Sequence, residues 1–90
     1  MDAIAQKTKQ IIADSLGVDV SAITHETRLV RDLGADSLDV VETVVMLEKA
    51  FNVTIPDERI DRMTTVGHFI EHFEKVRPIP EAFVYGSKAA

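Results

Sequence analysis

Residues 37–51 constrain the fold of this chain more than any other segment, because they show a helical period with a clear start and end. At 100° per residue, five large apolar side chains fall within one arc of the helical wheel: Val40, Val41, Val44, Leu47 and Phe51. We expect these five to form the core face. Asp36 stands at the N-cap position and Asn52 can end the helix. The segment therefore predicts a buried helix that other elements must cover.

Other apolar stripes supply those elements. One predicts a helix over residues 3–16, ended by Gly17, and another predicts a last helix that Thr64 or Thr65 caps. In the last helix, apolar residues recur at i, i+3, i+4 and i+7, namely Val66, Phe69, Ile70 and Phe73. A short helix should open at Pro56 and end near residues 61–62. Without strand-like alternation, the sequence predicts an all-α fold, a small four-helix bundle of three main helices and one short helix.

The helix of residues 37–51 has a second, mixed stripe away from its core face. With Leu38 at zero on the wheel, Glu42, Val45 and Lys49 lie within about 40° of it. Apolar residues that the core does not need suggest a docking surface. The alternative is that residues of the long 18–35 connection cover this stripe.

Ser37 occupies the first position of the same helix. Asp36 can accept backbone N–H bonds there as the N-cap, and Asp39 follows three residues later, where acids favour a helix start. A phosphate ester on Ser37 would lie beside unpaired N–H groups at the positive end of the helix dipole. The position therefore suits a phosphorylated group. The alternative is that Asp36 and Ser37 only cap the helix.

A second Asp-Ser-Leu sequence occurs at residues 14–16. Its serine, Ser15, falls in the last turn of the predicted first helix, where the dipole end is negative and disfavours a phosphate. The context therefore favours Ser37 over Ser15 as a modified residue.

The block around Ser37 resembles the acyl carrier proteins of dissociated (type II) fatty-acid synthesis. The resemblance runs from about residue 2 to residue 77 and rests on residues 33–39, followed by Val41-Glu42, Leu47-Glu48, Phe51 and Ile55-Pro56-Asp57. It implies that a phosphopantetheinyl transferase attaches phosphopantetheine to Ser37, with Asp36 and Asp39 helping to position it. The thiol of this arm would then carry an acyl chain as a thioester.

The resemblance also implies partners. Together with helix geometry, it points to Leu38, Glu42, Val45 and Glu48 as contacts for the transferase, a ketoacyl synthase and other enzymes of fatty-acid synthesis. It further implies that an acyl chain enters between apolar walls formed by Val41, Val44, Leu47, Phe51, Ile55, Ile60, Val66 and Phe69. Carriers of polyketide and aminoacyl intermediates share the fold and the serine, so the cargo stays open.

Charge and composition limit the classes of molecule that the chain is expected to bind. Between Asp32 and Asp61 there are eight acidic residues and two basic ones, in a chain of net charge −5. This acidity disfavours nucleic acid and anionic membranes and favours proteins with basic docking patches. The chain has no cysteine, so any thiol must come from a cofactor.

The sequence contains little that indicates a catalytic site or a metal site. His68 and His72 are four residues apart but lack the His-Glu-x-x-His pattern and a third ligand, so we expect surface histidines and no metal site. No Ser-His-Asp order is visible, and we expect no enzyme activity of the chain itself. The competing class is a small acidic calcium-binding regulator, although the EF-hand spacing is missing.

The expected organisation is one carrier domain over residues 1–78 and a mobile tail over residues 79–90. No apolar run approaches the length of a membrane span, and the N-terminus lacks a signal-peptide pattern. We therefore expect a cytoplasmic protein, and a monomer.

Overall fold

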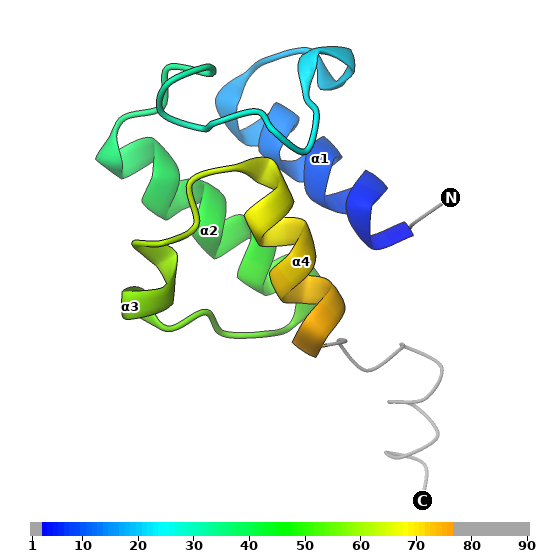
Figure 1. Cartoon of the computed structure of the whole chain (residues 1–90), viewed down its shortest axis with the longest axis vertical. Coiled ribbons are helices and arrows are strands. Elements are labelled where there is room, and N and C mark those ends of the chain that lie inside the picture. The colour runs from blue at the N-terminus through cyan, green and yellow to red at the C-terminus, as the bar shows by residue number, and fades with distance from the viewer. Residues whose placement is uncertain (1–2, 77–90) are drawn as a thin grey trace, which may run out of the picture.

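The computed structural model describes residues 3–76, and within that range it is built from helices (Figure 1). Their bounds are α1 Ala3–Leu16, the short 3-10 helix η1 Val20–Ala22, α2 Ser37–Phe51, α3 Asp57–Ile60 and α4 Val66–Val76. The predicted all-α bundle of three main helices and one short helix is confirmed. The predicted tail of residues 79–90 lies outside the described residues.

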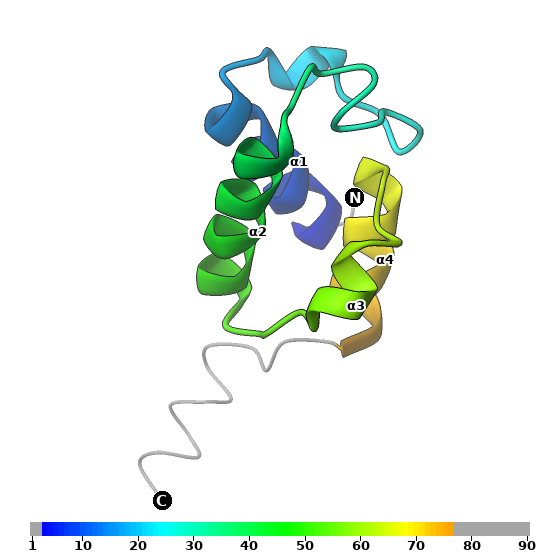
Figure 2. The same ribbon diagram turned by 90° about the vertical axis from the view of Figure 1, so that its left-hand side faces the viewer.

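The helices enclose one core. α1 packs against both α2 and α4, and Figure 2 shows α2 on one side of the molecule with α3 and α4 on the other. Phe51 of α2 stacks on Phe73 of α4, with 4.3 Å between ring centroids. The largest completely buried side chains come from all parts of the fold: Thr8, Ile12, Leu29, Thr43, Leu47, Val66, Phe69, Ile70 and Phe73.

One predicted core residue lies at the surface. Val41 is 56% exposed, whereas Thr43, two positions away, is completely buried. Thr43 can be buried because its hydroxyl pairs with that of Ser15 on α1, with 2.7 Å between the oxygens. The core arc of α2 is therefore centred closer to Thr43 and Leu47 than the apolar pattern indicates, and the assignment of Val41 to the core was wrong.

The long connection between α1 and α2 is fastened to the start of α4. Leu29 N–H donates to the carbonyl of Thr64, and Val66 N–H donates to the carbonyl of Thr27. Gly67 N–H donates to the carbonyl of His25, 2.9 Å away. A Cβ at Gly67 would lie only 2.9 Å from that carbonyl oxygen, so glycine permits this close approach. The connection thus forms a fixed cover over one end of the bundle.

Candidate functional site

The N-terminus of α2 is held by a reciprocal pair of hydrogen bonds. Asp39 N–H donates to Asp36 Oδ1 at 2.8 Å, and Asp36 N–H donates to Asp39 Oδ2 at 3.1 Å. This arrangement is a capping box, in which each carboxylate satisfies the other residue's backbone N–H. The chain enters it through Gly34, whose φ of 72° is readily adopted only by glycine. The predicted N-cap role of Asp36 is confirmed, and Asp39 completes the cap.

Ser37 is the first residue of α2 and its side chain is exposed. Within residues 3–76, its hydroxyl makes no hydrogen bond. The backbone N–H groups of Ser37 and Leu38 are likewise without acceptors in the described part of the chain. A nucleophilic oxygen therefore stands at the positive end of a helix, beside two donors suited to phosphate oxygens.

Ser15 has the opposite environment. It lies near the C-terminus of α1, is only half-exposed, and has its hydroxyl paired with buried Thr43. Modification there would break this hydrogen bond and place the new group at the negative end of a helix.

An exposed apolar patch follows Ser37 along α2. Two members are the predicted contacts Leu38, 63% exposed, and Val45, 40% exposed, and the predicted contact Glu42 is exposed beside them. The structure adds two apolar residues, Val41 and Met46. The α2 patch is defined as Leu38, Val41, Val45 and Met46. The sequence left open that residues of the 18–35 connection cover this surface, but no described loop residue buries it.

Glu48, the fourth predicted contact, is engaged within the fold. Its Oε2 accepts a hydrogen bond from the backbone N–H of buried Ile55, with 2.6 Å between the atoms. Its side chain is half-buried. Glu48 therefore tethers the segment between α2 and α3, a structural role that the helical period did not reveal.

A largely apolar hollow of about 640 Å³ lies between α2, the long connection and the α3–α4 segment. We call it the apolar hollow. Its apolar lining residues are Leu29, Val30, Val40, Ile60 and Met63. Val40 is three residues after Ser37, one helical turn further along α2. Of the predicted acyl walls, Ile60 lines this hollow, whereas Val44, Leu47, Phe51, Ile55, Val66 and Phe69 are buried in the core and Val41 is exposed.

The two histidines of α4 differ. His68 is exposed, and its Nδ1 accepts the backbone N–H groups of Thr64 and Thr65. His72 is only 8% exposed, so its assignment to the surface was wrong. Burial lowers the pKa of His72, and the charges of Arg59 and Lys75 lower it further. Within residues 3–76, no three potential ligands among His, Asp and Glu converge on a metal position.

The chain is similar to proteins that carry a prosthetic arm. Residues 6–73 match the family described as a phosphopantetheine attachment site. The chain is 43% identical over 72 residues to an acyl carrier protein of Helicobacter pylori, an alignment covering 80% of this chain and 92% of the relative.

A solved structure of the acyl carrier protein from Enterococcus faecalis has the same fold. It matches with a TM-score of 0.66 and 32% sequence identity, over 77% of this chain and 87% of that one. Among the described residues, no helix is both long and apolar enough to span a membrane.

Proposed function

Because the chain belongs to the acyl carrier protein family, which is marked by a phosphopantetheine attachment site, we propose that Ser37 is the residue that carries the phosphopantetheine. The protein is a carrier of acyl intermediates for fatty-acid synthesis. The observation that supports Ser37 is its exposed hydroxyl at the start of α2, which has no hydrogen-bond partner among residues 3–76, next to N–H groups of Ser37 and Leu38 that have no acceptor in that range.

The residues around Ser37 fit a phosphodiester. Phosphopantetheine supplies a thiol, which this cysteine-free chain lacks. Ser37 Oγ becomes the ester oxygen when it forms a bond to the phosphorus that bears the pantetheine of coenzyme A. The pyrophosphate P–O bond of coenzyme A breaks, the adenosine bisphosphate leaves, and the hydroxyl proton passes to a base of the transferase. The N–H groups of Ser37 and Leu38 are placed to receive phosphate oxygens at the positive end of α2. Asp36 and Asp39 are positioning residues, because their capping box fixes the first turn on which Ser37 stands.

The apolar hollow is the place we propose for the acyl chain. It lies one helical turn from Ser37 along α2, and its apolar lining suits methylene groups. This location differs from the buried core positions that the resemblance implied, because those side chains already pack against one another.

The α2 patch and the exposed carboxylate of Glu42 form the surface that we propose for partner enzymes, including the transferase and a ketoacyl synthase. Leu38 and Val45 supply apolar contact area, and the acids suit a basic patch on the partner. We propose that the chemistry is done by these partners, so the carrier itself is not an enzyme.

Two other functions give different observations. A carrier of polyketide or aminoacyl intermediates would have the same serine and arm but another cargo. A calcium-binding regulator would reorganise when calcium is added, whereas a carrier should only gain stability as its clustered acids are neutralised.

The intact mass of the protein isolated from its native host tests the proposal. We expect the mass of the chain plus one phosphopantetheine, with or without an acyl group whose mass identifies the cargo. A protein that carries no such addition under conditions of active lipid synthesis would contradict the carrier function.

A further inference from the structure

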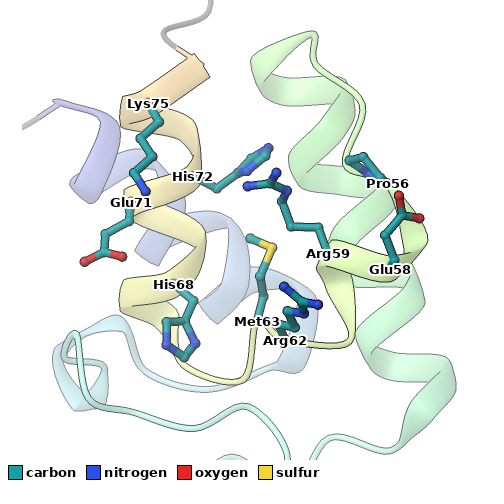
Figure 3. A pocket seen from close by; sticks show the side chains of 9 residues that line it. All are labelled: Pro56, Glu58, Arg59, Arg62, Met63, His68, Glu71, His72 and Lys75. Carbon is teal, nitrogen blue, oxygen red and sulfur yellow. The ribbon is translucent and has the colours of Figure 1, made fainter.

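A second hollow, of about 320 Å³, lies between α3 and α4, and no residue of α2 lines it. We call it the cationic hollow, because its lining includes Arg59 and Arg62 from the α3 segment and Lys75 from α4. His72 of α4 also lines it. Figure 3 shows the ends of the Arg59 and His72 side chains directed toward one another across it. Two arginines and a lysine thus line one hollow of a chain whose net charge is −5.

These positive groups lack the partners that usually accompany them. Within residues 3–76, Arg59, Arg62 and Lys75 form no ion pair. His72 is more than nine-tenths buried, and its Nε2 has no hydrogen-bond partner among the described residues. Such a group costs free energy unless something pairs with it. Burial is the main cause that lowers the pKa of His72, and the nearby charges of Arg59 and Lys75 lower it further.

The acidic residues on the rim do not supply the missing partner. Glu71 of α4 points away from the hollow, and Glu58 of α3 extends toward its outer edge (Figure 3). His68, the other titratable group on the rim, has its Nδ1 occupied by two backbone donors. The centre of the hollow is therefore faced by the side-chain ends of Arg59 and His72, whereas the Lys75 side chain runs along α4 toward Glu71 at the rim (Figure 3).

We propose that the cationic hollow is a binding site for a small oxyanion, either inorganic phosphate or the phosphate of a monoester. The guanidinium of Arg59 offers the paired N–H geometry that matches phosphate oxygens, and Lys75 at the rim adds positive charge without facing the centre (Figure 3). His72 Nε2 supplies a third donor when it carries a hydrogen. The volume equals that of about ten waters at ~30 Å³ each, enough for a hydrated phosphate.

The site would join α3 to α4. α3 has only four residues, from Asp57 to Ile60, and no side-chain cap at its N-terminus. An anion bound by Arg59 and His72 together would hold α3 against α4. Binding to the folded chain alone stabilises it by mass action, so the melting temperature should rise with phosphate concentration. This inference does not depend on the modification of Ser37.

The test is a titration of the full chain with phosphate at pH 7. The side-chain 15N signals of His72 and Arg59 report binding at each phosphate concentration. Ionic strength is kept constant with potassium chloride, so that general screening does not change. We expect saturable shifts of both signals, competition by sulfate and none by chloride. Glycerol 3-phosphate is the second arm: tighter binding than inorganic phosphate would indicate a monoester ligand, and equal binding the free anion.

Variants separate the site from the overall charge. Arg59→Gln changes an exposed residue, so the fold should persist, and binding should weaken about tenfold or more. Lys49→Gln removes the same charge from α2, outside the hollow, and should change the affinity less than about twofold. Shifts that stay linear in phosphate, or equal weakening by both variants, would overturn the proposal.

Discussion

Glu48 on α2 binds the backbone of Ile55 seven residues later, through a 2.6 Å hydrogen bond from the Ile55 N–H to Oε2. Because Ile55 is buried, loss of the acceptor would leave a donor unpaired. The acid therefore fixes the chain between α2 and α3.

Replacing Glu48 tests this role. We expect Glu48→Ala to lower the free energy of unfolding by about 1–3 kcal/mol, the cost of an unsatisfied buried donor. Glu48→Gln keeps an acceptor and should lose less. Glu42→Ala, an exposed acid on the same helix, is the matched control and should stay within about 0.5 kcal/mol. Urea denaturation measures all three, and equal effects of Glu48→Ala and Glu42→Ala would refute the tether.

The docking surface can be tested separately, with Glu48 left intact. Glu42→Lys should slow the phosphopantetheinyl transferase at low salt, by the roughly 0 to 1 kcal/mol typical of an exposed charge, and the difference should shrink at high salt. Lys49→Glu should leave the rate unchanged or raise it. Leu38→Ala removes an exposed apolar side chain from the α2 patch and should cost more than either charge change. Equal rates for the parent, Glu42→Lys and Leu38→Ala would mean that the transferase docks elsewhere.

His72 makes stability depend on pH in a defined direction. Its pKa is lowered in the folded chain, chiefly by burial and also by Arg59 and Lys75. The unfolded chain therefore binds the proton first, so the folded state loses stability as the pH falls below about 6.5. His72→Gln should flatten the melting temperature between pH 7.5 and 5.5. His25→Gln, which removes an exposed loop histidine, is the control, and the same flattening in that variant would contradict the assignment.

The acyl position leads to a further expectation. Acylation of the modified protein should raise its melting temperature, because each buried methylene contributes roughly 0.8 kcal/mol. Val40→Phe extends a side chain into the apolar hollow and should reduce this rise. Val45→Phe enlarges an exposed residue on another face of α2 and should not. If Val40→Phe leaves the rise unchanged, the acyl chain lies outside the apolar hollow.

The sequence predicted the helices well, because their signals are local. The bounds of α1 and α2 agree with the predicted 3–16 and 37–51, and the capping residues around Asp36 were visible as a pattern. Thr65, one of two predicted caps for α4, accepts the His68 N–H through its hydroxyl. These features depend on residues within one helical turn.

The errors concern contacts between distant segments. A helical wheel gives the angle of Val41 but not where α1 and α4 pack against α2, so it could not show that Val41 is exposed. It also could not show that Ser15 allows Thr43 to be buried. His72 was misplaced for a similar reason: its buried position depends on how α3 and α4 meet. The cluster it forms with Arg59 was invisible because the two residues are far apart in sequence and belong to different helices.

The most direct test of the account is the mass of the purified chain after incubation with coenzyme A and a phosphopantetheinyl transferase. The parent should gain one phosphopantetheine, and Ser37→Ala should gain none while keeping its fold, because Asp36 and Asp39 still cap α2. Ser15→Ala is the matched control and should be modified like the parent, although loss of the hydrogen bond to Thr43 should lower its melting temperature. A parent that stays unmodified with several transferases, or a Ser37→Ala variant that still gains the mass, would contradict the assignment of Ser37 as the attachment site.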